Sequence, residues 1–400
     1  MKAYKPPSGA HARELLLRRS RDAKMARSAH AYVRGNTAKF YEWLQTASSD
    51  LVPAGPPIWI CGDCHLGNLG PVASAEGDVE IEIRDLDQTV IGNPAHDLIR
   101  LALSMATAAR SSDLPGVITA RILEQMMEGY EEGLRHPDAR PGRSNATASV
   151  RIVLKQALKR KWHNLASERI KDVSPTIPIG KSFWPLSAPE KREIDKLFGT
   201  EGVRKLVTGL HNRHKNDEMR VLDAAYWVKG CSSLGRLRFA VLLEVGKHRH
   251  REGRFCLIDI KEAIEPAAPR FSKAKMPRDH AARVVEGACR LSPFLGERMI
   301  AGRFLGRSVV VRELLPQDLK LAMDQLTREE ATAAARFLAT VVGRAHARQM
   351  EPAMRDKWRS DLIRHKSKNL AAPSWLWSSV VELIASHEIA YLNHCRTYAE

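Results

Sequence analysis

The feature that most constrains this chain is a group of glycine, acidic and amide residues between positions 61 and 97. Gly62-Asp-Cys-His-Leu-Gly-Asn68 is followed by Asp85-Leu-Asp87 and then by Gly92-Asn-Pro-Ala-His-Asp97. The apolar stretch 58–61 and the alternating stretch 79–84 predict short strands before and between these motifs. A helix is predicted from position 94, where proline suits a first turn. The acidic and amide side chains are therefore expected in loops close to strand ends.

These motifs resemble those of the aminoglycoside phosphotransferase and choline kinase branch of the protein-kinase-like fold. That branch has a His-Gly-Asp-x-His-x-x-Asn loop, an Ile-Asp strand end and a Gly-Asp-Pro…Asp segment. Nine positions agree, namely Gly62, Asp63, His65, Gly67, Asn68, Asp85, Gly92, Pro94 and Asp97. The first position departs, since Cys61 stands where the family has His. The resemblance implies a kinase-like fold and transfer of a phosphoryl group from ATP, with Mg²⁺, to a small-molecule acceptor.

The chemistry of phosphoryl transfer gives each of these residues a role. An Asp at a strand end can orient an acceptor hydroxyl and take its proton, whereas an Asn and a later Asp can hold the metal that bridges the phosphates. We interpret Asp63 as the base, and Asn68 and Asp85 as the metal ligands. Mg²⁺ needs few protein carboxylates when phosphate oxygens complete its coordination shell. His65 and Asp97 are expected to brace the loop. Asp87 is expected to be a polar neighbour of the site, with a second metal ligand as the alternative.

A nucleotide-binding lobe is expected downstream of these motifs, because about sixty helical and basic residues precede Asp63. A helix that begins with a capping box at Ser187 and Glu190 is predicted to extend to about 208. Strands are predicted at 224–229, 237–245 and 255–261, followed by two more near 298–304 and 308–314. A glycine turn between the first two would let backbone N–H groups approach phosphates closely. In kinases a lysine on the third strand pairs with the α/β-phosphates and with a glutamate of the next helix. The predicted nucleotide-binding residues are thus Gly230, Ser232, Ser233, Gly235, Lys261 and Glu286.

The order of these parts predicts a circular permutation. In the usual kinase order the nucleotide lobe precedes the catalytic loop, whereas here the loop comes first. We therefore predict an α+β, bilobal, protein-kinase-like fold that is circularly permuted, with a small antiparallel nucleotide lobe and a large helical lobe. Residues 1–220 form the helical, catalytic lobe, with the catalytic loop at 61–97 and a basic helical insertion at 151–216. Residues 221–318 form the β-rich lobe, and 319–400 complete the helical lobe.

The whole order also resembles a bacterial family known as domain-of-unknown-function family 2252. The resemblance covers most of residues 20–350 and supplies no substrate. Beyond the loop at 62–68, the shared motifs are Arg34-Gly35, Gly230-x-x-Ser-x-Gly235, Lys261-Glu-Ala263, Arg283-Val-Val-Glu-Gly287 and Ala345-His-Ala-Arg348.

The net charge of +17 is concentrated in two segments. Residues 1–40 carry a net charge of +8 and residues 151–216 a net charge of +9, so the remaining chain is neutral. Both segments are expected on the helical lobe, where they would face an acidic acceptor or partner. Nucleic-acid binding is an alternative but is not favoured, since no nucleic-acid motif accompanies the basic residues.

The expected compartment follows from apolar runs and cysteine content, and the type of reaction leaves two alternatives. No apolar run suits a transmembrane helix or a signal peptide, and the six cysteines form no disulfide framework, so a cytoplasmic protein is expected. Two alternatives to phosphoryl transfer remain open: nucleotidyl transfer at the same metal site, and a non-catalytic protein that binds nucleotides or nucleic acid.

Overall fold

The computed structural model describes residues 10–47, 52–112, 114–139, 176–210, 213–231, 234–246, 255–315, 327–363 and 372–398. Residues 151–175 of the predicted basic insertion lie outside these ranges.

Six strands form one antiparallel sheet in the order β5-β6-β7-β8-β10-β9. They are β5 (Phe183–Trp184), β6 (Met219–Trp227), β7 (Arg238–Val245), β8 (Phe255–Glu262), β9 (Met299–Phe304) and β10 (Arg307–Leu314). The five strands predicted in this region are confirmed, although β6 begins five residues earlier than predicted. A mixed α+β fold is therefore confirmed as well.

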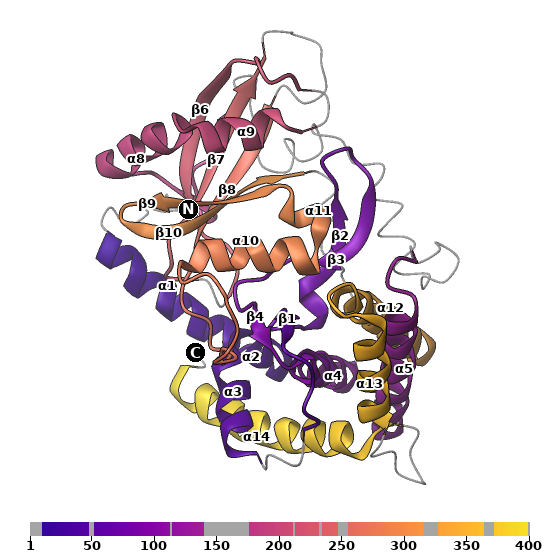
Figure 1. The fold of residues 1–400 in the computed structure, drawn as a ribbon. Helices are drawn as coiled ribbons and strands as arrows, with labels where there is room; N and C mark the ends of the chain where they lie inside the picture. The colour runs from indigo at the N-terminus through magenta and orange to yellow at the C-terminus, as the bar shows by residue number, and fades with distance from the viewer. Residues whose placement is uncertain are drawn as a thin grey trace.

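The two faces of the sheet are covered by different helices (Figure 1). Helices α8 (Ala188–Phe198) and α9 (Glu201–Thr208) pack on one face, where Leu197 and Val203 meet Phe239 and Ile258. Helix α10 (His280–Leu291) packs on the other face, through Val284 against Val310. Alternate residues of a strand point to opposite faces, so both sides of the sheet carry apolar positions.

This packing differs from the expected division of the chain. The segment 151–216 is predicted above as part of the helical lobe, yet its described helices α8 and α9 cover the sheet. The single helix expected from Ser187 to about 208 is also two helices, broken at Gly199 and Thr200. Its predicted start is confirmed, because the Ser187 backbone N–H donates to Glu190 in a capping box.

Helix α4 (Pro94–Ser111) lies at the centre of the helical part and is buried on nearly all sides. The helices that pack against it are α2 (Ala29–Gly35), α5 (Gly116–Arg135), α12 (Arg328–Ala347) and α14 (Ser374–Tyr398). The remaining helices are α1 (Ala10–Met25), α3 (Thr37–Thr46), α11 (Pro293–Gly296) and α13 (Pro352–Ile363). Since α12 follows the sheet in sequence and α4 precedes it, the two ends of the chain build one helical core (Figure 1).

Two further antiparallel pairs of short strands lie outside the six-stranded sheet. Strand β1 (Ile58–Ile60) pairs with β4 (Val90–Gly92), and β2 (Leu69–Ala73) pairs with β3 (Val79–Ile83). Strands β1 and β3 were expected from the sequence, whereas β2 and β4 were not. The loop that carries the acidic and amide residues lies between β1 and β2. Within the described residues, no helix is long and apolar enough to cross a membrane.

Helices α5 and α12 approach each other so closely that glycine is required between them. A Cβ atom added to Gly129 would overlap the backbone carbonyl of Arg336, and one added to Gly343 would overlap that of Tyr130. Gly116, at the start of the same α5 helix, has open space around it. The glycines of this interface therefore serve close packing.

We predict that Gly129→Ala lowers the free energy of unfolding by about 1–3 kcal/mol, because overpacking forces the two helix backbones apart. Gly116→Ala is the matched control and should be neutral or slightly stabilising, since alanine favours helix. Urea denaturation of both variants measures the difference. Equal stability of the two would contradict the tight α5–α12 contact.

A buried carboxylate links the β2–β3 pair to helix α11. Glu82 accepts the backbone N–H of Leu295 at 3.3 Å, and burial raises its pKa to about 7 from an ordinary 4.5. Because the folded-state pKa is the higher one, the stability contributed by protonated Glu82 is complete below about pH 4.5 and is lost as the pH rises through 7.

The free energy of unfolding should decline between pH 5 and pH 8 in the wild type. We predict that this decline is smaller in Glu82→Gln, by up to about 3 kcal/mol. The exposed Glu76→Gln variant should follow the wild-type curve. Urea denaturation at a series of pH values provides the measurement, and parallel curves for all three proteins would refute this role of Glu82.

Candidate active site

The loop after β1 is held in place by the carboxylate of Asp97, which is fully buried. One oxygen accepts the backbone N–H of Cys61 at 2.7 Å, and the other accepts that of Gly62 at 2.9 Å. His346 of α12 contacts the same carboxylate through Nε2 at 3.1 Å. The bracing role predicted for Asp97 fits these contacts, which join α4, α12 and the loop at one point.

Asp63 lies one residue beyond this anchor and is 8% exposed. Its Oδ1 accepts from Nε of Arg100 at 2.8 Å, and Arg100 itself is fully buried on α4. The second oxygen, Oδ2, lies 4.0 Å from Nε2 of His65. Arg100 was not singled out in the sequence, although an arginine three residues after Asp97 on an otherwise apolar helix was a signal for it.

His65 is buried and neutral. Burial lowers its pKa to about 4, despite the nearby carboxylate of Asp63. Its Nδ1 accepts the backbone N–H of Gly67 at 3.0 Å, so the proton is carried by Nε2. His65 therefore shapes the turn of the loop and directs an N–H toward the unpaired oxygen of Asp63.

Asn68 ends the short 3₁₀ turn of this loop. Its amide nitrogen donates to the backbone carbonyl of Asp63 at 2.9 Å, which leaves the amide oxygen as the atom suited to bind a metal. Asn68 and Asp85 line the same cavity. In the described part of the chain, no group of three or more His, Cys, Asp or Glu side chains could hold a metal ion. A divalent ion at this pair would therefore need ligand oxygens to complete its shell.

Lys261, at the end of β8, meets two carboxylates of the loop after β3. Its Nζ lies 3.1 Å from Oδ1 of Asp85 and 2.5 Å from Oδ2 of Asp87. Burial alone would raise the pKa of Asp85, but the Lys261 ammonium outweighs burial and holds the pKa well below its usual range. For Asp87, burial and the charge of Asp85 raise the pKa. The sequence places Asp85 and Lys261 176 residues apart, and the structure brings them together as expected.

The same loop is fixed from the other side by Arg283 of α10. Its buried guanidinium donates to the backbone carbonyls of Thr89, Asp87 and Ile264. In the sequence this arginine stands out only as part of the Arg283-Val-Val-Glu-Gly287 motif. It positions the segment that carries Asp85 without contacting the carboxylate itself.

The glycine turn between β6 and β7 occupies the place expected for it. Gly230 and Gly235 adopt positive φ angles of 93° and 94°, which favour glycine. Gly230 lines the same cavity as Asn68 and Asp85. Ser232 and Ser233 lie outside the described residues.

Glu286 does not take the position predicted for it. The buried face of α10 carries Val284 and Gly287, whereas Glu286 is half-exposed. Among the described residues, Lys261 forms ion pairs with Asp85 and Asp87 and none with Glu286. Glu262, the residue after Lys261, also points away, since it accepts the backbone N–H of Leu237 and pairs with Arg307.

A cavity of about 540 Å³ lies between the loop, the sheet and the N-terminal helices. This volume is within the range of small-molecule sites. Residues from the loop (His65, Asn68), the β3 end (Asp85) and the glycine turn (Gly230) share its lining, whereas Asp63 is not part of it. The candidate base thus lies behind His65, and an acceptor would need to reach Oδ2 past that ring.

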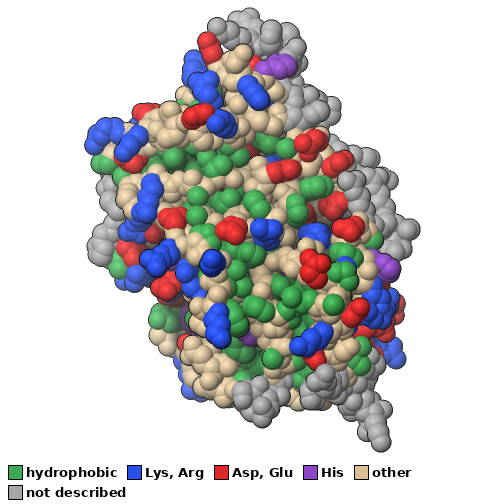
Figure 2. Space-filling view, viewed as in Figure 1, with side chains coloured by type: hydrophobic (Ala, Val, Ile, Leu, Met, Phe, Trp, Pro, Cys, Tyr) green, Lys and Arg blue, Asp and Glu red, His purple; other side chains and the backbone are tan. Residues whose placement is uncertain are grey.

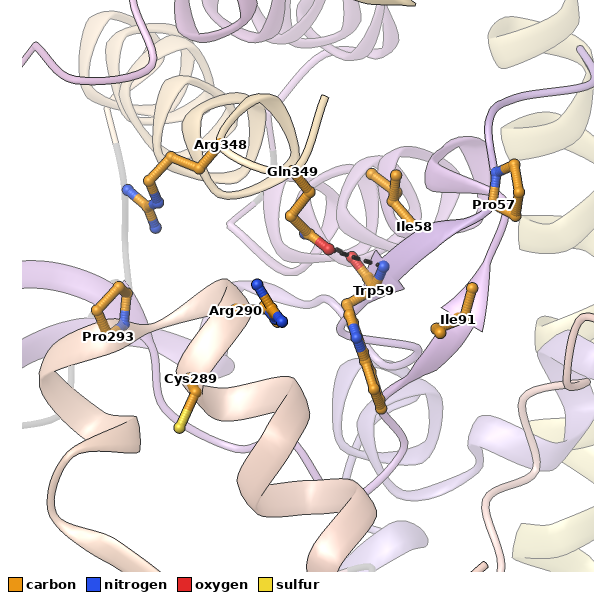
Figure 3. Close-up of a pocket in the computed structure, with 9 residues that line it drawn as sticks. All are labelled: Pro57, Ile58, Trp59, Ile91, Cys289, Arg290, Pro293, Arg348 and Gln349. Carbon is orange, nitrogen blue, oxygen red and sulfur yellow. Dashed lines mark hydrogen bonds between the residues drawn. The ribbon is translucent and has the colours of Figure 1, made fainter. Parts of the chain in front are cut away.

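A second cavity, of about 400 Å³, lies beside β1 and contains none of the predicted site residues (Figure 3). Figure 3 shows Arg348 and Gln349 extending from the end of α12, and Arg290 and Cys289 from the end of α10. Gln349 binds both the N–H and the carbonyl of Trp59, at 2.9 and 3.0 Å. These two hydrogen bonds join the chain at the end of α12 to β1.

The structure therefore defines a mixed α+β protein with a charged cavity between an antiparallel sheet and a helical core. The chain belongs to a bacterial family described as "Uncharacterized protein conserved in bacteria (DUF2252)", whose model matches residues 14–397. This match confirms the resemblance to domain-of-unknown-function family 2252 that the sequence motifs indicated. Neither a curated protein nor a solved structure matched the chain.

We predict that Asp97→Asn destabilises the fold by about 3 kcal/mol, because an amide NH₂ would replace one acceptor oxygen facing backbone N–H groups. Asp356→Asn, at an exposed carboxylate that pairs with Arg359, should change stability by less than about 0.5 kcal/mol. Chemical denaturation measures both. If Asp97→Asn is as stable as this control, Asp97 does not anchor the loop.

Proposed function

We propose that this protein is a phosphotransferase that moves the γ-phosphoryl group of ATP, with Mg²⁺, to a hydroxyl of a small acceptor. The observation that carries the proposal is the contact of Lys261 with Asp85, two residues far apart in sequence, because Asp85 lines one cavity with the amide of Asn68 and with Gly230 of the glycine turn. In protein kinases the same parts recur: a glycine-rich turn, a lysine on the third strand, a metal-binding Asp and an Asn.

The topology of the sheet supports this proposal. The glycine turn joins the first two long strands, β6 and β7, the lysine lies on the third, β8, and helix α10 follows before β9. A kinase nucleotide lobe has a strand lysine followed by a helix in this order. With the loop of Asp63 placed before the sheet in sequence, the proposed fold is a circularly permuted kinase-like one.

In the proposed reaction the acceptor oxygen forms a bond to the γ-phosphorus, the bond from that phosphorus to the β,γ-bridging oxygen breaks, and ADP leaves. Asp63 takes the hydroxyl proton on Oδ2, the oxygen that Arg100 does not bind. Asn68 and Asp85 would hold Mg²⁺, which neutralises phosphate charge when bound. Lys261 would exchange its contact with Asp85 for the nucleotide phosphates. The half-exposed position of Glu286 argues that Asp87 serves as the second partner of Lys261.

The burial of Asp63 gives a reason to test a second reaction. Asp63 is paired with Arg100 and lies outside the cavity lining, and these features favour a reaction less dependent on a base in that position. Nucleotidyl transfer would use the same metal ligands. Incubation with ATP labelled at the α- or at the γ-phosphate separates the two, since only the transferred phosphate leaves its label on the acceptor.

We predict that Asp85→Asn abolishes the Mg²⁺-dependent part of the thermal stabilisation by ATP, because the metal loses its carboxylate. Asp63→Asn should retain this stabilisation but lower turnover of γ-labelled ATP by about 10²–10⁴-fold. Differential scanning fluorimetry and phosphate release provide the two readouts.

The matched control is Asp78→Asn, at an exposed carboxylate of the β2–β3 turn, which should behave as the wild type in both assays. Absence of any ATP-dependent shift in the wild-type protein would refute the phosphotransferase proposal. Retention of the full Mg²⁺-dependent shift in Asp85→Asn would refute the assigned metal site.

A further inference from the structure

The cavity beside the loop has an unusual charge. Among the described residues that line it, seven are lysine or arginine and one, Asp85, is a carboxylate. On the face shown in Figure 2, by contrast, acidic and basic side chains both occur across the surface. A concave site lined by one sign of charge concentrates oppositely charged ligands.

On the sheet side of this cavity the cations are balanced by a buried acid. Arg238 binds both oxygens of Asp259, at 2.9 and 2.6 Å, and Arg312 binds the same carboxylate at 3.2 Å. Asp259 is fully buried, and these two arginines hold its pKa well below its usual range in spite of burial. Both arginines are therefore committed to a structural partner.

On the helix side the cations have no such partner. Three cations lie here, namely Lys24 on α1, Arg27 in the turn that follows and Arg34 on α2. In the described part of the chain, none of them forms an ion pair with a carboxylate. Lys24 donates to the carbonyl of Gly230 at 3.2 Å. The Nε atom of Arg34 is buried and has no hydrogen-bond partner among the residues that the structure describes. Leaving such a donor unpaired is unfavourable, and an oxygen of a bound ligand would satisfy it.

Arg34 also lies at the catalytic loop itself. A Cβ atom added to Gly67 would overlap its guanidinium, so the arginine packs directly over the backbone between His65 and Asn68. The planar guanidinium suits two oxygens of one phosphate or carboxylate group. An anion bound here would lie next to the candidate base and metal ligand.

We propose that the acceptor is a phosphorylated hydroxyl compound whose dianionic phosphate is bound by Lys24, Arg27 and Arg34. This inference rests on the proposed function, which assigns the nucleotide phosphates to Lys261, the metal pair and the glycine turn. Three cations match a dianion better than a single carboxylate, and their place on the helix side leaves the sheet side for the nucleotide.

The test is titration of inorganic phosphate into the full chain saturated with Mg²⁺ and ADP, followed by calorimetry. We expect saturable binding that weakens at least tenfold in Lys24→Gln/Arg34→Gln. The matched control is Lys39→Gln/Arg110→Gln, which removes two positive charges from α3 and α4 outside the cavity and should bind phosphate as the wild type does. Acetate, titrated in the same way, should bind at least tenfold more weakly.

The outcomes separate this inference from the function on which it rests. Failure of the wild type to bind Mg²⁺ and ADP would overturn the proposed function. Normal nucleotide binding without saturable phosphate binding would overturn the phosphate site alone. Equal weakening in both double variants would also overturn it, since general electrostatic attraction would then explain the affinity. Acetate binding as tight as phosphate would overturn the phosphorylated acceptor in favour of a carboxylate.

Discussion

The rest of the site depends on the buried carboxylate of Asp97. It accepts two backbone N–H groups of the loop and a contact from His346, which lies 249 residues away on α12. A loop is ordinarily the mobile part of a fold, but here its first residues are fixed to two core helices. Asp63 follows the anchored Gly62 directly, and Asn68 is tied to the carbonyl of Asp63. One interaction thus sets the position of both candidate functional side chains.

A second set of charges joins this loop to the sheet. Lys261 reaches Asp85 and Asp87 from β8, while Arg283 binds three carbonyls from α10. The two cations act differently. Arg283 is bound to backbone groups and fixes the chain path. Lys261 is bound to carboxylates, and in the proposed function a metal would bind a carboxylate while phosphates bind Lys261. The site therefore combines the backbone contacts of Arg283 with the ion cluster of Lys261, Asp85 and Asp87. Such a cluster suits a site that admits a charged ligand.

The sequence predicted those parts of the fold that local patterns determine. The long strands of the sheet and the capping box at Ser187 depend on periodicity and on spacing within one turn. Strands β2 and β4 have three to five residues each and gain stability only from pairing, so no local signal marks them. In the site, the juxtaposition of Asp85 and Lys261 was predictable from motif order. The orientation of Glu286 was not, because the buried face of α10 depends on how that helix packs.

The environment of the basic residues also depends on packing and could not be predicted from local patterns. Two basic segments with similar net charge were expected to serve one surface, but their described residues 10–40 and 176–210 lie in different environments. On α8 and α9 the basic residues, among them Lys191, Lys196 and Lys205, are exposed on the outer side of helices that cover the sheet. Surface charges of this kind are well hydrated and contribute little to stability. Lys24 and Arg34 instead line a cavity without a carboxylate partner in the described chain. Packing therefore distinguishes these cations from the exposed ones, and the proposed acceptor site rests on the basic residues of the N-terminal helices rather than on the overall net charge.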